Sequence, residues 1–269
     1  MKMYRLVTFA ILLAVAIGCS TVPLTGRRQV NLLPESELIA MGFAGYADFL
    51  KENPPSGDRA NSDMVKEVGS NIVNAVNRYF EQNGLSSRLD GYEWEFTLVD
   101  DDVPNAWAMP GGKVVVYKGL LPYTETREGL AVVIGHEIAH VVARHGNERM
   151  SHGLLVQLGG IALSEATKEK PEETRNIFLL AYGAGSQIGA VLPYSRQHEK
   201  EADRLGLIFM AMAGYNPEAA VPFWEKMMSS GGGTKPPEFL STHPADETRI
   251  GLIKGLIPEA KKYLLQSSQ

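Results

Sequence analysis

Disulfide bonds and a basic surface are two features that this sequence lacks. Cys19 is its single cysteine, so no two cysteines of one chain can pair. The 26 lysines and arginines are outnumbered by 31 aspartates and glutamates, and the formal net charge of −5 leaves no basic footprint for nucleic acid. The 269 residues contain no internal repeat of fixed period. We therefore expect no nucleic-acid partner and a fold stabilised by its core rather than by cross-links.

The first residues contain an apolar run that is too short to cross a membrane comfortably. Lys2 and Arg5 precede the uncharged stretch from Leu6 to Ile17, which is the layout of a secretory signal peptide. We therefore expect residues 1–18 to be removed and the rest of the chain to reach the periplasm.

Cys19 directly follows this run. The residues Ala16-Ile17-Gly18-Cys19 resemble a bacterial lipoprotein cleavage box, with Ala16 where leucine is usual. The resemblance implies that Cys19 is lipidated, and Ser20 in place of aspartate favours the outer membrane over the inner one. The alternative is an incidental cysteine at a conventional signal-peptidase site. On the first interpretation, residues 19–33 form a lipidated N-terminal segment.

The most informative motif is His136-Glu137-x-x-His140. On an α-helix, residues four apart lie on one face, about 6 Å from each other, so both imidazoles can reach one metal ion. A catalytic zinc ion commonly takes three protein ligands and leaves one position for water, whose proton Glu137 can accept. Apolar residues from Leu130 to Ala143 surround the motif and indicate a buried helix. The alternative is a hydrogen-bonded histidine pair on a core helix.

The third ligand has to come from another segment. A metzincin would need glycine at position 143 and histidine at 146, but the chain has Ala143 and Gly146. A glutamate on a later helix is the remaining option, and Tyr194 to Gly206 is the best-marked segment.

The two motifs together carry a family resemblance. His136-Glu137-x-x-His140 is followed by Arg144-His145, and Ser195-Arg196 precedes Glu199-x-x-x-Asp203. This pattern resembles the BepA/LoiP-type bacterial zinc metallopeptidases, relatives of HtpX, mitochondrial Oma and the CAAX-prenyl endopeptidases. Further matching segments span nearly the whole chain after the signal: residues 31–37, 105–112 and 242–244. The short stretch after Ile257 is similar to the repeat-free LoiP form.

The resemblance implies that Glu199 binds zinc and that Asp203 supports the site. Glu199 and Asp203 are four residues apart, so they share a helical face from which a carboxylate can orient a ligating imidazole. The alternative for Glu199 and Glu201 is a solvated charged face. His198 is interpreted as a surface histidine, and Glu165 is a poor substitute ligand.

The coarse pattern predicts an α+β fold. Helices are expected at 35–52 and 60–82, and strands at 93–99 and 113–117 with a turn at 110–112 between the strands. The rest is helical. We predict a mostly helical, zincin-like domain over residues 34–269, with a small antiparallel β-sheet beside the active-site helix.

Two further segments are candidate parts of the site. In zincins, an edge strand commonly binds the substrate as an added strand, and the candidate here comprises Asn105, Ala106, Trp107, Ala108 and Met109. An ordinary hairpin without a ligand is the alternative. His243 is similar to a histidine that approaches the zinc ion in BepA-like proteins. It would occupy the open position of a latent enzyme, stabilise the oxyanion of an active one, or simply cap a helix.

Two apolar stretches, 153–163 and 177–192, flank a charged segment. Both are too short to cross a membrane, so a packed helical hairpin is predicted. It would cover the site or mediate subunit contacts, and a membrane-facing hairpin is the alternative. Oligomeric state stays open.

These expectations combine into a function. One Zn²⁺ per chain, bound by His136, His140 and Glu199, would serve hydrolysis of peptide bonds with Glu137 as the base. The resemblance implies an endopeptidase acting on misfolded or stalled cell-envelope proteins. The alternatives are a chaperone-like outer-membrane assembly lipoprotein with a latent or structural zinc site, and a cell-wall glycan hydrolase. Glu137 argues against a purely structural site.

Overall fold

The computed structural model describes residues 19–186, 192–230, 238–244 and 247–267. The chain forms two compact units. The hairpin unit comprises Met1–Glu35 and Arg144–His198, and the sheet unit comprises Ser36–Ala143 and Glu199–Gln269. The expected signal peptide at 1–18 lies outside the described residues. The single-domain boundary at residue 34 and the lipidation of Cys19 stay predictions.

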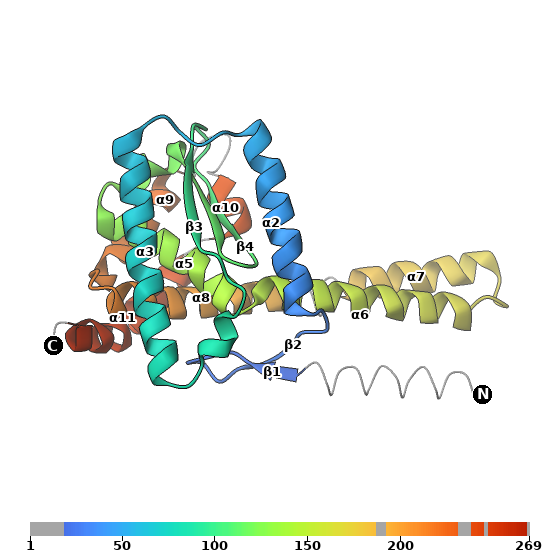
Figure 1. Cartoon of the computed structure of the whole chain (residues 1–269). Helices are drawn as coiled ribbons and strands as arrows, with labels where there is room; N and C mark the ends of the chain where they lie inside the picture. The colour runs from blue at the N-terminus through green and yellow to red at the C-terminus, as the bar shows by residue number, and fades with distance from the viewer. Residues whose placement is uncertain (1–18, 187–191, 231–237, 245–246, 268–269) are drawn as a thin grey trace. The chain divides into compact units, whose positions relative to one another are not determined.

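The sheet unit starts with two long helices, α2 (Glu35–Glu52) and α3 (Arg59–Gln82), as the sequence predicted within one residue. Three strands follow: β3 (Glu95–Val99), β4 (Ala106–Met109) and β5 (Lys113–Tyr117). They form a sheet in the order β3-β5-β4. Helix α3 packs along β3, and α5 (Arg127–Val142) packs against β4 (Figure 1).

The sheet is mixed, so the prediction of an antiparallel sheet is wrong for one strand pair. Strands β4 and β5 are antiparallel, joined by a tight turn in which Gly111 and Gly112 have φ of 89° and 94°. Strand β3 pairs with β5 in parallel, with Phe96 opposite Val114. After β3 the chain crosses to the far edge of the sheet and forms β4 there. Strand β5 then fills the position between β3 and β4 and runs parallel to β3.

Helix α5 is buried almost completely. The Thr126 hydroxyl caps its start by accepting a hydrogen bond from the Gly129 amide at 3.1 Å. Its neighbours include α3, β4, α4 (Leu121–Thr124) and α9 (Ala220–Ser230), which cover the helix from several sides. A helix covered on several sides needs no polar face, which explains why α5 has apolar residues on all sides.

The remaining elements are mostly helical, as predicted. The last helices are α8 (Leu192–Met212), α9, α10 (Glu238–Thr242) and α11 (Glu247–Ser267). Within the described part of the sheet unit, short 3₁₀ helices connect elements at Ser86–Leu89, Lys118–Leu120 and Pro217–Ala219. Trp224 and Phe239 pack with ring centroids 5.7 Å apart and form an aromatic part of the core.

In the hairpin unit, β1 (Cys19–Thr21) pairs antiparallel with β2 (Arg28–Val30). Helices α6 (His145–Ala166) and α7 (Glu172–Ser186) form the predicted helical hairpin. The Tyr182 hydroxyl donates to the Val156 carbonyl at 2.9 Å and fixes the two helices together. Among the described residues, no helix combines the length and hydropathy that a membrane crossing requires.

A buried ionic cluster holds the hairpin unit together. Glu148 on α6 accepts hydrogen bonds from Arg27 at 2.6 and 2.8 Å and from His198 at 2.8 Å. His198 is only 3% exposed, and its ring stacks on that of His145 at 4.3 Å. The interpretation of His198 as a surface histidine is therefore wrong, because a carboxylate fifty residues earlier in the chain provides it with a buried partner.

Candidate metal centre

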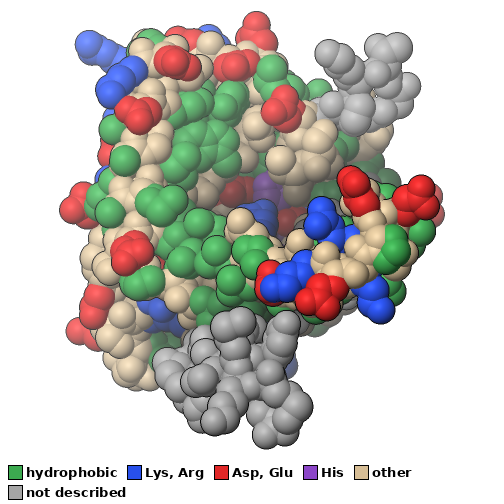
Figure 2. Space-filling view, turned by 90° about the vertical axis from the view of Figure 1, so that its right-hand side faces the viewer, with side chains coloured by type: hydrophobic (Ala, Val, Ile, Leu, Met, Phe, Trp, Pro, Cys, Tyr) green, Lys and Arg blue, Asp and Glu red, His purple; other side chains and the backbone are tan. Residues whose placement is uncertain are grey.

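Helix α5 presents the two motif histidines from one face, as their spacing predicts. Their Nε2 atoms lie 3.0 Å apart. Both side chains are largely buried, at 3% and 13% exposed. Figure 2 shows histidine atoms recessed below the molecular surface, with acidic and basic side chains beside them.

Helix α8 brings Glu199 to these histidines. Glu199 Oε2 is 3.3 Å from His136 Nε2, and Oε1 is 3.3 Å from His140 Nε2. Glu201 is also buried, but it is not part of this cluster. The alternative that Glu199 and Glu201 lie on a solvated charged face is therefore wrong.

The close approach of α5 and α8 depends on two glycines. A Cβ atom on Gly135 would lie 2.9 Å from the Gly206 carbonyl oxygen, and one on Gly206 would lie 2.8 Å from the His136 amide nitrogen. Both distances are shorter than ordinary contacts, so the backbones meet only because neither residue has a side chain. This role of the two glycines was not predicted from the sequence, although Gly206 stands three residues after Asp203.

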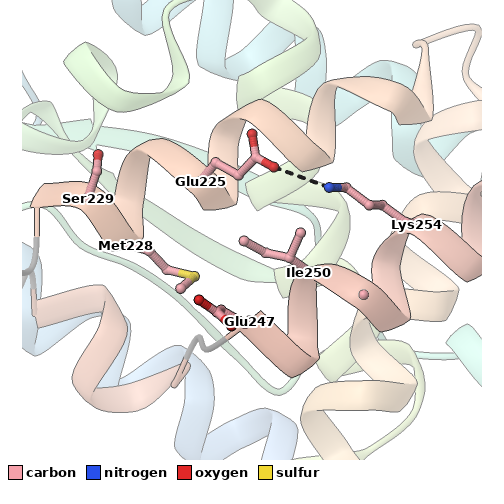
Figure 3. A pocket seen from close by; sticks show the side chains of 7 residues that line it. Glu225, Met228, Ser229, Glu247, Ile250 and Lys254 are labelled. Atoms are coloured by element: carbon pink, nitrogen blue, oxygen red, sulfur yellow. Dashed lines mark hydrogen bonds and ion pairs between the residues drawn. The ribbon is translucent and has the colours of Figure 1, made fainter.

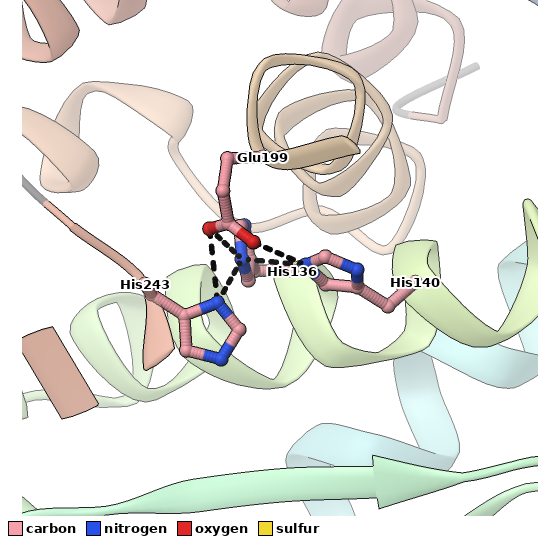
Figure 4. Close-up of side chains that lie close together, drawn as sticks. All are labelled: His136, His140, Glu199 and His243. Carbon is pink, nitrogen blue, oxygen red and sulfur yellow. Dashed lines mark hydrogen bonds and ion pairs between the residues drawn. The ribbon is translucent and has the colours of Figure 1, made fainter. Parts of the chain in front are cut away.

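His243 joins the cluster from the residue after α10. Its Nδ1 lies 3.1 Å from His136 Nε2 and 2.9 Å from Glu199 Oε2 (Figure 4). Its Nε2 lies 3.3 Å from Oε1 of the buried Glu137. Thus His243 reaches both the metal-ligand candidates and the candidate base, which a simple capping role would not require.

The donor set fits a zinc ion. Ligand atoms of His136, His140, Glu199 and His243 all lie within 4.8 Å of one another. Zn–N bonds of about 2.05 Å in a tetrahedron give ligand separations of about 3.3 Å, close to the distances found here. His136 Nε2 faces three such atoms at 3.0, 3.1 and 3.3 Å, and one N–H could satisfy only one of them. A shared cation satisfies all three.

Asp203 lies behind His136, one helical turn beyond Glu199. Its Oδ1 is 3.1 Å from His136 Nδ1, the ring nitrogen that faces away from the cluster. Burial raises the pKa of Asp203, but the adjacent Arg249 guanidinium lowers it further, so the pKa is below its usual range. Asp203 is therefore a charged carboxylate suited to orienting His136.

The two motif histidines have different proton affinities. Burial lowers the pKa of His136, but Asp203 and Glu199 raise it more, to about 9. For His140, burial dominates and lowers the pKa to about 3. Burial raises the pKa of Glu199, yet the histidines around it hold that pKa well below its usual range. An ionised Glu199 and a neutral His140 are in the ligand-competent protonation state, whereas His136 has to release one proton when a metal ion binds to it.

The candidate substrate strand is an edge strand. Of the segment Asn105 to Met109, residues 106–109 form β4, at one side of the described three-stranded sheet. Trp107 Nε1 donates to the Tyr117 hydroxyl at 3.2 Å, and its ring meets that of Phe49 edge-on. Asn105 and Ala106 are buried, whereas residues 107–109 are half-buried.

Two other features are separate from the metal cluster. Glu165, the substitute ligand, is exposed on α6 and pairs with Lys168. A groove of about 570 Å³ runs between α9 and α11 (Figure 3). Its lining residues are Glu225, Met228, Ser229, Glu247, Ile250, Gly251 and Lys254. None of these is a ligand candidate.

Comparisons with known proteins agree with this geometry. Residues 68–257 match the model of peptidase family M48. The chain is 37% identical over 241 residues to mitochondrial metalloendopeptidase OMA1 of Schizosaccharomyces pombe, covering 89% of this chain and 67% of the relative. It is 32% identical over 251 residues to metalloendopeptidase OMA1, mitochondrial, of Homo sapiens, covering 89% and 46%.

A bacterial relative is as similar in identity as the human one. The beta-barrel assembly-enhancing protease of Escherichia coli K12 is 32% identical over 264 residues, which cover 95% of this chain and 51% of the relative. The chain thus spans about half to two thirds of the length of these curated relatives. The family match covers both histidines of the motif, Glu199, Asp203 and His243. The predicted resemblance to BepA- and Oma-type metallopeptidases is confirmed, and the lipoprotein form stays a prediction. The chain belongs to peptidase family M48 and carries its zincin-like metallopeptidase domain.

Proposed function

We propose that this protein is a zinc-dependent endopeptidase that hydrolyses peptide bonds of misfolded or stalled cell-envelope proteins. The observation that carries the proposal is the convergence of His136, His140 and Glu199 at 3.0–3.3 Å with Glu137 beside them. A purely structural zinc site would have no need for that glutamate. The proposed metal content is one zinc ion per chain.

His136, His140 and Glu199 are the residues that would hold the ion. When bound there, zinc supplies a Lewis acid that polarises a substrate carbonyl and lowers the pKa of water. Glu137 accepts the proton of the attacking water and passes it to the leaving amine. Asp203 keeps the His136 ring oriented, which is the supporting role that carboxylates take behind histidine ligands.

His243 supports a latent form of this enzyme. Its Nδ1 has the spacing of a fourth ligand, and its Nε2 faces Glu137. In this arrangement His243 competes with water for the open position and engages the base. Moving His243 away would release both, so we propose that it acts as a switch. The oxyanion role is the alternative, in which His243 stays and donates to the substrate carbonyl oxygen.

Strand β4 is the proposed binding edge for the substrate. Backbone hydrogen bonds along such an edge give affinity that tolerates many sequences, which suits unfolded clients. Helix α5 packs against β4, so a peptide added to the sheet there would run beside the motif helix.

The proposed location is the periplasm, with a lipid anchor on Cys19 in the outer membrane. Support comes from the apolar run before Cys19 and from the similarity to a bacterial protease whose name refers to β-barrel assembly. Unfolded or misfolded envelope proteins are the proposed partners. A chaperone-like assembly role is the second candidate function, and the ligand-like position of His243 is the observation that favours it.

The first test is cleavage of an unfolded protein by the chain from Ser20 onward. Wild type is compared with Glu137→Gln, and with wild type after chelation and zinc return. Glu165→Gln is the matched control, because that exposed glutamate lies outside the metal cluster. We expect cleavage by wild type, control and zinc-restored protein, and at least a ~100-fold loss for Glu137→Gln. A Glu137→Gln variant that cleaves at the wild-type rate would refute the proposal.

His243→Ala distinguishes the two roles of His243. Faster cleavage than wild type supports the latent state, whereas a roughly 100-fold slower reaction supports the oxyanion role. Unchanged cleavage of every substrate tried would show that His243 has neither role.

A further inference from the structure

Arg249 on α11 lies at the centre of the contacts that support the metal cluster. Its side chain is 6% exposed. Nε and Nη2 donate to the two carboxylate oxygens of Asp203 at 2.8 and 2.7 Å. Nη1 donates to the backbone carbonyls of His243 at 3.1 Å and Pro244 at 2.9 Å. Each nitrogen of the guanidinium therefore has an acceptor.

The flat face of the guanidinium is also held. Its Cζ atom lies 3.7 Å from the ring centroid of Trp224, which is buried on α9. Contacts to both the edge and the face of the group leave it little freedom to rotate. A lysine could not reproduce this arrangement, because an ammonium has neither the planar fork nor the stacking surface.

The contact to Asp203 leads directly to a ligand candidate. Asp203 Oδ1, which accepts from Arg249, also lies 3.1 Å from His136 Nδ1. A carboxylate held there favours the tautomer of His136 with the proton on Nδ1, which leaves Nε2 available to a metal. Without its arginine, Asp203 would be a buried charge with one partner fewer, and its orientation would no longer be fixed.

The contacts to the two carbonyls lead to the other side of the cluster. They hold the backbone of His243 and Pro244, just after α10 ends at Thr242. His243 thus contacts the site through its ring and is tied to Arg249 through its own carbonyl group. One side chain connects a residue of α8 with the segment that presents His243.

We propose that Arg249 is a positioning residue of the metal centre. Its guanidinium fixes the Asp203–His136 pair and the backbone of His243 together, so that the ligand geometry and the place of His243 are set by the same group. The inference rests on the proposed zinc site and adds a residue that couples the Asp203–His136 pair to His243. Charge favours the arrangement, since Glu137, Glu199 and Asp203 are three carboxylates that one arginine and one divalent cation would balance.

The test measures metal binding without any substrate. Zinc affinity is obtained by competition with a chromophoric chelator, and ligand geometry from the visible absorption of Co²⁺ bound to the same chain. The variants are Arg249→Met and Arg249→Lys. Arg204→Met is the matched control, because Arg204 on α8 makes a similar two-bond pair with Glu259, at 3.0 and 2.8 Å, away from the cluster.

We expect Arg249→Met to bind zinc about 10- to 100-fold more weakly, as is typical when the group behind a ligand is lost. Its Co²⁺ spectrum should differ from that of wild type. Arg249→Lys should bind about 10-fold more weakly, because it keeps the charge and loses the fork. Arg204→Met should keep the wild-type spectrum and an affinity within about threefold, as expected for a partly exposed ion pair.

A second measurement tests the coupling. If Arg249 sets the position of His243, removing the His243 ring should weaken zinc binding in wild type and have little further effect in Arg249→Met. The two changes would then be non-additive. Fully additive effects would overturn the claim that one group couples both sides.

Folding is checked by circular dichroism before each measurement. A folded Arg249→Met protein with wild-type zinc affinity and Co²⁺ spectrum overturns the proposal. If that variant is unfolded, Arg249→Lys is judged by the same two measures. If it too is unfolded while Arg204→Met folds, Arg249 is a structural residue and the positioning role is wrong. Wild type that binds no zinc refutes the proposed function as well, whereas wild type that binds zinc but cleaves nothing refutes only the peptidase activity.

Discussion

Helices α5 and α6 follow each other in the chain and are both rich in apolar residues, yet they are buried to very different extents. In α5, Leu130, Ile134 and Ile138 have no exposed surface. In α6, Leu158 and Ile161 are 48% and 59% exposed. The difference lies in their neighbours, because α5 packs against the sheet and several helices of its unit, whereas α6 packs mainly against α7 and β2. Burial is thus decided by the number of packing partners, and less by residue type.

The hairpin shows the same contrast on its second helix. Ile177 and Leu180 on α7 are 66% and 73% exposed. Arg144, with φ of 58°, separates α5 from α6, whose first two turns are still buried at His145 and Glu148 before the exposed part begins. A non-glycine residue in this left-handed conformation costs about 1 kcal/mol, so the break is held by its surroundings and not by local preference.

The largest expected difference in stability between the two regions comes from replacing a glycine by alanine. Gly206→Ala places a methyl group against the His136 backbone, so we expect a loss of about 3 kcal/mol in the free energy of unfolding and weaker zinc binding. In α6, a Cβ atom on Gly153 would meet nothing within 4 Å. Gly153→Ala should therefore be neutral or stabilise by up to about 1 kcal/mol. Urea unfolding of both variants checks this, and equal destabilisation would contradict the contrast.

A smaller difference is expected for a large apolar side chain. Leu130→Ala in α5 should lower the free energy of unfolding by about 3 kcal/mol, because it leaves a cavity in a fully packed core. Leu180→Ala in α7 should change it by less than about 0.5 kcal/mol, since that side chain is already mostly in solvent. The measurement is again urea unfolding, with m-values compared. Similar losses in the two variants would mean that α7 is covered in solution.

The smallest effect depends on pH and tests the ionic cluster of the hairpin unit. Burial raises the pKa of Glu148, but His152, His198 and Arg27 lower it further, well below its usual range. Because the folded-state pKa is depressed, the stabilisation is present above the unfolded value of 4.5 and is lost as the pH falls below it. Glu148→Gln should cost about 2 kcal/mol at pH 7. The difference in stability between variant and wild type, followed by thermal unfolding, should become smaller below about pH 4.5. A stability difference that stays constant from pH 7 to pH 3 would show that it does not come from the ionisation of Glu148.

The sequence predicted what local patterns determine. The helix at 35–52 and the strand at 113–117 were predicted at their observed bounds, because turn residues and apolar periodicity mark both. The i, i+4 spacing likewise placed His136 beside His140. Glu199 was harder, because it lies on another helix and needed the family resemblance.

The strand predicted at 93–99 starts two residues later, at Glu95, and the larger errors and omissions are long-range. The parallel pairing of β3 with β5 depends on a crossover that strand patterns do not encode. His198 was misjudged because its partner Glu148 is 50 residues away, and Arg249 was missed because it is 46 residues from Asp203. The glycine contact between α5 and α8 belongs to the same class, since a helical glycine gives no local sign of what approaches it.

The ligand candidates come from distant parts of the chain: His136 and His243 are 107 residues apart. A metal ion held by both would close a loop of that length, which in chain-entropy terms corresponds to about 4.7 kcal/mol for a cross-link over some 100 residues. By mass action, a ligand at 100 times its Kd adds about 2.7 kcal/mol to the folded state. The lifetime of this protein would then vary with the zinc concentration around it, and zinc starvation would remove the enzyme itself as well as its activity.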